Sequence, residues 1–154
     1  MKIYTDGSAH PTNPGPGGLG IVVCDDNDKI LYTISKHFDY PITNNQMELL
    51  ALLMTLKLYG NATSIAYPEP PTVYTDSSYA LNTYTNWMFG WERKGWIKSD
   101  NKTPENLNII KEYYNLVQQG YKINLQKVKA HAGHIPNEIA DKLAKGEIKS
   151  DITF

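Results

Sequence analysis

The sequence predicts an α/β protein with a five-stranded mixed sheet, three antiparallel strands followed by two parallel ones, flanked by helices. Three observations predict this class. The first 37 residues contain β-forming runs separated by short turns, the apolar period then changes to three or four, and later strand-like and helical segments alternate. Strands separated by a helix are free to run parallel, whereas strands joined by short turns pair antiparallel.

The first three strands are expected at residues 2–5, 19–24 and 30–35. Residues 13–18 are all Asn, Pro or Gly, which are typical of turns, and residues 25–28 are expected to form a second, acidic turn. Because short turns connect these strands, we expect them to form an antiparallel meander.

The remaining elements follow from caps, breakers and periodicity. A helix is expected over residues 43–59, capped by Thr43 or Asn44, and Gly60 ends it. A cap, a proline and an acid at residues 103–105 open another helix that ends at Gly120. The other predicted segments are a strand at 72–75, a helix at 78 to about 93, a strand at 123–129 and a helix at 136 to about 145.

Composition limits the function classes. The chain has 154 residues, a mass of 17.4 kDa and a net charge of −1, which fits one ordinary domain and excludes a disordered or collagen-like chain. Its single cysteine, Cys24, excludes an internal disulfide. A secretory signal and a bilayer-length apolar segment are both missing from the sequence, so we expect a cytoplasmic monomer with no membrane association. Near-neutral charge means that any polyanion must be bound through local patches or bound cations.

Two segments seventy residues apart share one pattern. Residues 3–8 and 73–78 both read aliphatic-Tyr-Thr-Asp-small-Ser, which places Asp6 and Asp76 where a strand ends. A single aspartate at such a place commonly begins a turn or caps a helix. Because the pattern is repeated, we expect the two strands to be neighbours and the two carboxylates to lie side by side, facing a ligand-binding crevice.

Two further carboxylates fit the same crevice. Glu48 lies early in the helix that begins near Asn44, and Asp141 lies in the last helix. Four clustered carboxylates repel one another unless cations neutralise them. Oxygen ligands without cysteine suit Mg²⁺ or Mn²⁺, and two such ions form a known clamp for displacement at phosphorus.

Histidine and tryptophan supply the remaining candidates. His131 lies in a loop with small residues before the last helix, where it could carry protons. His134 in the same loop could equally have no role, and His10 and His37 are expected to have none. A second segment interleaves aromatic and basic residues, and it is either a packed helix face or a nucleic-acid-binding arm. That segment contains Trp87, Trp91, Trp96, Arg93, Lys94, Lys98 and Lys102.

Together these motifs resemble type 1 ribonuclease H in its bacterial form. The resemblance rests on residues 4–8, 13–18, 43–48 and 75–77, on the tryptophan segment, and on residues 131–134 followed by Asp141. It implies a ribonuclease H-like fold with one domain over residues 1–148 and a short tail at 149–154. The implied activity is an endonuclease that cuts the RNA strand of RNA/DNA hybrids and leaves 5′-phosphate and 3′-hydroxyl ends.

The resemblance also assigns roles to residues. It implies that two Mg²⁺ ions, for which Mn²⁺ could substitute, are held by the four carboxylates Asp6, Glu48, Asp76 and Asp141, assisted by His131. Contacts to the RNA minor groove would come from Asn13, Asn44 and Asn45. A DNA-strand phosphate would be held by Thr43 and Asn106, and Trp87 would face the DNA strand.

The chain departs from the family pattern at three places. The loop between Asp6 and Asn13 is one residue longer than usual, Ser78 stands where many relatives have glutamine, and Glu92 occupies a usually basic position in the arm. We expect the change at Glu92 to weaken hybrid affinity at raised salt.

Other function classes remain open at this stage. A binding module that grips a hybrid without cutting it is disfavoured by the complete carboxylate set. The nuclease domain of a reverse transcriptase is a third possibility, and a transposase-type nuclease fits the asparagines less well.

Overall fold

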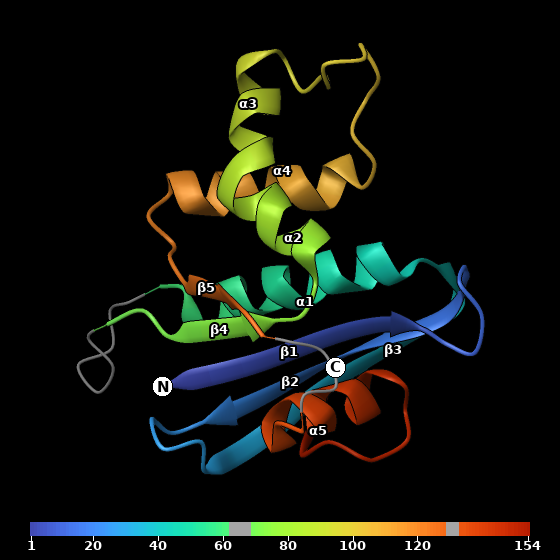
Figure 1. The fold of residues 1–154 in the computed structure, drawn as a ribbon, viewed down its shortest axis with the longest axis vertical. Helices are drawn as coiled ribbons and strands as arrows, with labels where there is room; N and C mark the ends of the chain where they lie inside the picture. Colours follow the sequence, from blue (N-terminus) through green and yellow to red (C-terminus); the bar gives the residue numbers. More distant parts are fainter. Residues whose placement is uncertain (62–68, 129–132) are drawn as a thin grey trace.

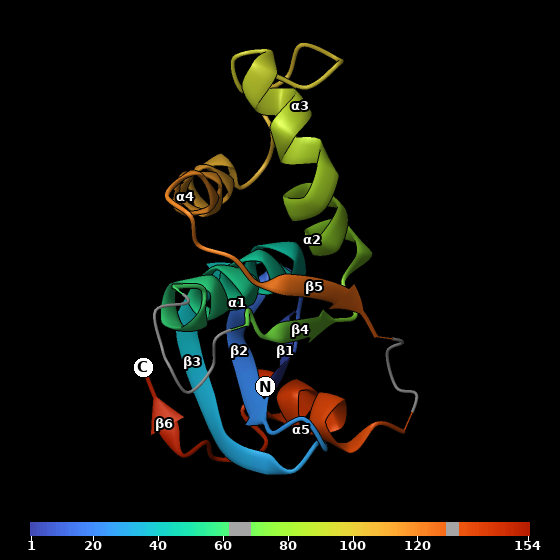
Figure 2. The same ribbon diagram turned by 90° about the vertical axis from the view of Figure 1, so that its left-hand side faces the viewer.

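A mixed sheet with the strand order β5-β4-β1-β2-β3-β6 forms the centre of the protein. The computed structural model describes residues 1–61, 69–128 and 133–154. Figure 1 labels the strands β1 to β5 of this sheet, and Figure 2 also labels β6. The strands are β1 (Lys2–Ala9), β2 (Gly15–Cys24), β3 (Ile30–Ile42), β4 (Thr72–Thr75), β5 (Asn124–Lys127) and β6 (Ile152–Thr153).

The strand directions confirm the predicted sheet. β1, β2 and β3 pair antiparallel in sequence, while β4 runs parallel to β1 and β5 runs parallel to β4. All five predicted strands are present, and β3 extends seven residues beyond its predicted end at residue 35. The last predicted residue of the fifth strand, at position 129, lies outside the described residues.

The structure adds a sixth strand that the sequence did not reveal. β6 pairs parallel with β3, and Asp151 accepts hydrogen bonds from the backbone N–H and the hydroxyl of Thr33, at 2.9 and 3.2 Å. A two-residue strand has no detectable periodicity, so only its pairing with a distant edge identifies it. The segment expected to be a tail therefore covers part of the outer edge of β3.

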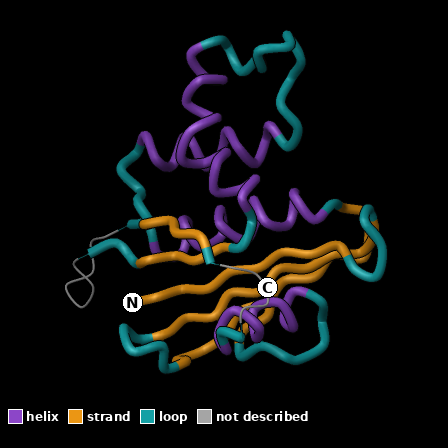
Figure 3. The backbone as a smooth tube through the Cα atoms, viewed as in Figure 1, coloured by secondary structure: helices purple, strands orange, loops and turns teal. Residues whose placement is uncertain are grey.

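Helices lie on both faces of the sheet (Figure 2). α1 (Asn44–Tyr59) covers one face and α5 (Ile135–Ala144) covers the other, with the strands as one layer between them (Figure 3). α2 (Ser78–Asn82), a π-helical turn η1 (Thr83–Trp87) and α3 (Met88–Arg93) follow β4 without a break, and α4 (Leu107–Gln118) packs beside α1. In the part of the chain that the structure describes, no helix combines the length and apolar character needed to span a membrane.

The start of α4 differs from the prediction. The helix begins at Leu107, because Asn106 immediately before it adopts a left-handed backbone with φ of 59°. The predicted opening at residues 103–105 is an irregular segment whose proline, Pro104, is buried. Asparagine tolerates the left-handed region better than most residues, so it ends the irregular segment here.

Each face of the sheet has its own apolar cluster. The larger cluster joins β1, β2 and β4 to α1, and the smaller one packs Tyr4, Val22 and Cys24 against Ala140 and Leu143 of α5. Cys24 is fully buried in the smaller cluster, which agrees with a core role for this thiol. The two clusters fix α1 and α5 on opposite sides of β1, and β1 carries the first candidate aspartate.

Candidate active site

The repeated strand pattern is realised as a parallel pair. β1 and β4 are neighbours, and their register pairs Ile3 with Val73 and Tyr4 with Tyr74. The offset between paired residues is seventy, equal to the spacing of the two sequence repeats. Asp6 and Asp76 therefore stand at the same level on adjacent strands, as the sequence predicts.

Glu48 reaches this pair because α1 approaches β1 very closely at Gly7. A Cβ atom at Gly7 would lie 2.3 Å from the carbonyl carbon of Met47 and 2.5 Å from the backbone nitrogen of Glu48. Only glycine permits this backbone contact. Thr43 caps the helix, and its hydroxyl accepts a hydrogen bond from the Gln46 N–H at 3.1 Å, which fixes where α1 starts and hence where Glu48 points.

Three carboxylates converge at this point. One oxygen each from Asp6, Glu48 and Asp76 lies within 4.8 Å of the other two. Asp6 and Glu48 are 6% and 8% exposed, and Asp76 is half-buried. Gly7 donates a backbone hydrogen bond to Asp6 Oδ1 at 2.9 Å, whereas the buried Glu48 Oε2 has no hydrogen-bond partner among the described residues.

The electrostatics of the cluster disfavour full ionisation. Burial raises the pKa of Asp6 to about 7, and the neighbouring charges of Asp76 and Asp141 act in the same direction, against a hydrogen bond with Glu48 that lowers it. Burial, followed by the charge of Asp6, also holds the pKa of Glu48 well above its ordinary value. A group of carboxylates in this state gains most from a bound cation.

Asp141 joins the cluster from the opposite side of the sheet. It lies on α5, and its interaction with Asp6 contributes to the raised pKa of the Asp6 carboxyl. Its Oδ2 atom also lies 3.2 Å from the Nζ atom of Lys145, one turn further along the helix. The structure thus brings all four predicted carboxylates together, with Asp141 at the edge of the cluster beside the Lys145 ammonium group.

His131 lies outside the described residues. His134, whose role the sequence leaves open, is the residue that precedes α5, and its ring lies 5.0 Å from that of Tyr4. Its Nε2 atom is 3.6 Å from Asp28 Oδ2, and Asp28 also accepts a hydrogen bond from the Tyr4 hydroxyl at 2.7 Å. These contacts tie the start of α5 to β1.

The predicted RNA-contacting asparagines lie together at the start of α1. Asn44 Oδ1 accepts a hydrogen bond from the backbone N–H of Ala9 at 2.7 Å, and Asn13 Oδ1 accepts one from the backbone N–H of Asn44 at 3.1 Å. The longer loop after β1 therefore still brings Asn13 to Asn44. Asn45 is exposed beside them.

The other residues predicted to contact the substrate include three at the starts of α1, α2 and α4. Ser78, the first residue of α2, contacts the Lys127 ammonium at the end of β5. Thr43 is exposed at the start of α1, and Asn106, at the start of α4, donates a hydrogen bond to the Tyr79 hydroxyl at 3.4 Å. The shared phosphate pocket of Thr43 and Asn106 implied by the resemblance stays a prediction.

The tryptophan segment divides between the two expected roles, a packed face and a binding arm. Trp91 and Trp96 pack against the larger apolar cluster, so they act as core residues. Trp87 is 41% exposed, its ring lies 6.3 Å from that of Tyr79, and both line a cavity of about 410 Å³ with Lys98. Trp91 lines the same cavity, and Trp87 is the exposed tryptophan of the segment and so is placed to meet a ligand.

Comparison with known proteins decides the family. The family model described as RNase H matches residues 1–149. The chain belongs to the RNase H family. It is similar to Ribonuclease H of Agrobacterium fabrum, with 39% identity over 94% of this chain and 92% of the relative, and to Ribonuclease HI of Haemophilus influenzae, with 39% identity over 94% of this chain and 87% of the relative.

Solved structures share the RNase H fold. The LC9-RNase H1 structure, a type 1 RNase H with the type 2 active-site motif, matches with a TM-score of 0.74 and 24% identity, over 97% of this chain and 74% of that one. LC11-RNase H1 in complex with an RNA/DNA hybrid matches with a TM-score of 0.63 and 23% identity, over 92% and 91%. A foamy viral protease-reverse transcriptase in complex with RNA/DNA hybrid matches with a TM-score of 0.76 and 22% identity, over 92% of this chain but 19% of that one.

Sequence reasoning missed two features of this RNase H site. Lys145 follows Asp141 by four residues on a helix, a spacing that commonly pairs opposite charges and could have been noticed. The contact of His134 with Tyr4 and Asp28 joins segments far apart in the chain, and no local pattern indicates it.

Proposed function

We propose that this protein is an endoribonuclease that hydrolyses the RNA strand of RNA/DNA hybrids and leaves 5′-phosphate and 3′-hydroxyl ends. One observation carries the proposal: three carboxylates from β1, α1 and the end of β4 converge within 4.8 Å, and Asp141 approaches from α5. Membership of the RNase H family, with curated relatives named Ribonuclease H across nearly their full length, supports the same activity.

The donor set fits hard divalent cations. All candidate ligands are carboxylate oxygens, and the buried Glu48 Oε2 lacks a hydrogen-bond partner among the described residues, as expected of an atom placed for a metal. Asp6, Glu48, Asp76 and Asp141 would hold two Mg²⁺ ions, with Mn²⁺ as a possible substitute. Such a pair supplies an activated water and stabilises the leaving 3′ oxygen.

The chain's own residues orient these ligands and move protons. The Gly7 N–H holds the Asp6 carboxylate in place, and the closeness of α1 to β1 holds Glu48 against it. In the proposal, His131 carries a proton during turnover or product departure, because imidazole exchanges protons near neutral pH. His131→Ala should therefore slow steady-state cleavage far less than Asp6→Asn, and equal losses would give the histidine a more central role.

Recognition of the hybrid follows from the polar residues around the cluster. Asn13, Asn44 and Asn45 would read the RNA minor groove, where the 2′-hydroxyl distinguishes RNA from DNA. Ser78 would lie near the same groove. Thr43 and Asn106 would hold a DNA phosphate, and the exposed Trp87 ring would face the DNA strand.

The organisation of the protein belongs to the same proposal. A single RNase H domain over residues 1–148, followed by residues 149–154, is supported by the family match to residues 1–149. We also propose that the protein acts as a monomer. A cytoplasmic location is proposed because the curated relatives are bacterial and hybrids form where DNA is copied or transcribed.

One cleavage assay tests the activity. Labelled RNA is offered single-stranded, paired with RNA and paired with DNA, each with Mg²⁺ and with EDTA. We expect cutting only of the DNA-paired RNA in Mg²⁺. Binding without cutting would indicate the non-catalytic module instead, and cutting of single-stranded RNA would contradict the proposed specificity.

A further inference from the structure

A cavity of about 460 Å³ lies between the end of α5 and the surface of β2 and β3. Its walls include His10, His37 and Lys145, and Gly17 contributes to its floor. The volume falls within the roughly 300–1,000 Å³ of small-ligand sites. None of these side chains has a part in the proposed hydrolysis.

Lys145 connects the cavity to the cluster. Its Nζ atom lies 3.2 Å from Asp141 Oδ2, and its side chain also lines the cavity. A helical turn advances about 5.4 Å, so the cavity begins one turn away from the carboxylate of Asp141. When cations neutralise Asp141, this carboxylate attracts the ammonium group less strongly, and the ammonium group can bind another anion.

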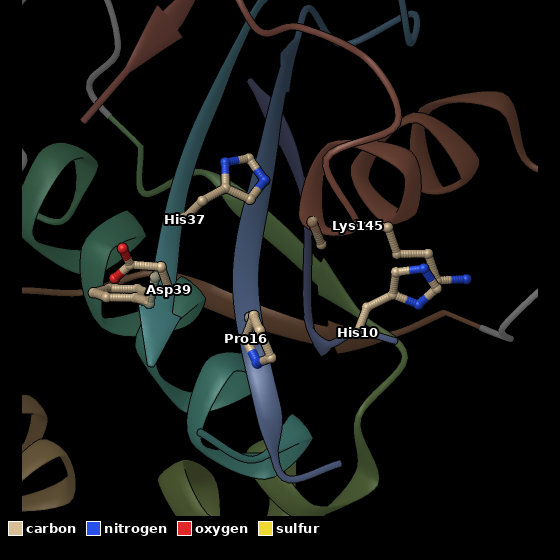
Figure 4. Close-up of a pocket in the computed structure, with 8 residues that line it drawn as sticks. His10, Pro16, His37, Asp39 and Lys145 are labelled. Atoms are coloured by element: carbon tan, nitrogen blue, oxygen red, sulfur yellow. The ribbon is translucent and has the colours of Figure 1, made fainter. Parts of the chain in front are cut away.

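His10 lies on the same side of the cavity as Lys145, as Figure 4 shows. It follows β1 directly, and its backbone N–H donates a hydrogen bond to the Pro16 carbonyl at 2.8 Å, which holds the longer loop in place. Side chains alternate along a strand, so His10 continues the face of Asp6 and Ser8. His10 is thus an exposed imidazole four residues beyond Asp6 on that face.

His37 forms the opposite wall, on β3. Its Nε2–H donates to the Leu143 carbonyl of α5 at 2.8 Å, which fixes the ring and leaves Nδ1 for a ligand. Asp39, also on β3, is the acidic member of the lining and lies across the cavity from Lys145 and His10 (Figure 4). Lys145 and His10 form one side of the cavity and the Asp39 carboxylate lies on the other, so an anion would bind on the side of Lys145 and His10.

We propose that this cavity binds a backbone phosphate of the RNA strand, a neighbour of the phosphate being cleaved, with Lys145 and His10 as the donors. The inference rests on the proposed function, since it takes the strand over the carboxylates as its starting point. A nucleic-acid strand that passes the cluster presents further phosphates at regular intervals, and Lys145, which lines the cavity, lies 3.2 Å from Asp141 of the cluster. Ammonium and imidazole groups are ordinary phosphate partners.

The test measures binding of a labelled RNA/DNA hybrid to full-length Asp76→Asn protein in Mg²⁺, with further changes added. Lys145→Met keeps the aliphatic stem and removes the charge. We expect its Kd to rise about fivefold to tenfold and the slope of log Kd against log salt to fall by about one. Lys142→Met, an exposed lysine on the same helix that does not line the cavity, is the matched control and should change neither quantity.

A second variant separates the subsite from the metal site. His10→Ala should weaken hybrid binding about threefold while Mn²⁺ affinity, measured by calorimetry on otherwise wild-type protein, stays unchanged. Asp39→Asn should tighten hybrid binding, because it removes the negative charge of a carboxylate that lines the cavity. Inorganic phosphate should compete weakly with the hybrid in the parent protein and not at all in Lys145→Met.

The outcomes distinguish the two proposals. If wild-type protein cuts the hybrid but Lys145→Met and His10→Ala bind it as the parent does, the subsite is wrong and the proposed function stands. Loss of hybrid affinity that follows only a loss of Mn²⁺ affinity, with His10→Ala neutral, also overturns the subsite. Protein that neither binds nor cuts hybrid overturns both.

Discussion

Replacing Asp6 with asparagine should stabilise the metal-free protein at alkaline pH. The folded protein keeps the Asp6 proton up to about pH 7, whereas an unfolded chain releases it near 3.8. Between these values the folded state binds more protons than the unfolded state, so the free energy of unfolding falls as pH rises. The difference between the two pKa values corresponds to about 4 kcal/mol above pH 7.

The asparagine side chain would remove this penalty and could still accept the Gly7 hydrogen bond. Because the pKa of Glu48 is also raised and the two carboxyl groups share the cost of ionisation, we expect a gain of about 2–4 kcal/mol at pH 8 and less than about 1 kcal/mol at pH 4. For a chain of this size the gain at pH 8 is a rise in Tm of roughly 4–16 °C.

Thermal unfolding in EDTA, followed by circular dichroism at pH 4, 6 and 8, measures this effect. Glu147→Gln removes an exposed acid and is the control, which should show no pH-dependent difference. Added Mg²⁺ should raise the Tm of the wild type at pH 8 and leave Asp6→Asn nearly unchanged. An Asp6→Asn protein that is equally destabilised at pH 4 and pH 8 would refute the reasoning.

Three further predictions follow from the same geometry. Asp76→Asn should retain hybrid binding in Mg²⁺ and lose nearly all cleavage in a gel assay; full activity would remove Asp76 from the metal site. Gly7→Ala should cost about 1–3 kcal/mol and weaken Mn²⁺ binding measured by calorimetry, because the new Cβ meets the α1 backbone, while Gly90→Ala, with open space around it, should do neither. Deleting residues 150–154 should lower stability by about 1 kcal/mol through loss of the hydrogen bonds to Thr33, without changing cleavage at 25 °C; unchanged stability would make the β6 pairing unimportant.

The sequence predicted the parts of the site that are encoded locally. The repeat around Asp6 and Asp76 indicated neighbouring strands, and the observed register of seventy residues confirms it. The capped helix with Glu48 was predictable because Thr43 and the apolar period mark its start. These features depend on residues close in the chain, where propensity and periodicity are informative.

Other parts depend on contacts between distant segments. The close approach at Gly7 requires the position of α1 relative to β1, and the pairing of β6 with β3 joins residues more than a hundred positions apart. The left-handed Asn106 delays α4 despite a strong start signal at residues 103–105. In each case tertiary packing determines the local structure, and the sequence pattern near these residues does not indicate that packing.

The carboxylate cluster is hard to explain as a device for stability. Burial and the neighbouring carboxylates raise the pKa of both Asp6 and Glu48, that of Asp6 to about 7, and Glu48 Oε2 is buried without a hydrogen bond among the described residues. Replacing any one of these acids by a neutral residue of similar shape should relieve the repulsion. This arrangement costs stability, yet a backbone contact at Gly7 and a helix capped by Thr43 hold it in place, so it is suited to binding a metal cation. At Asp141 the Lys145 ammonium group offsets the negative charge without a metal ion.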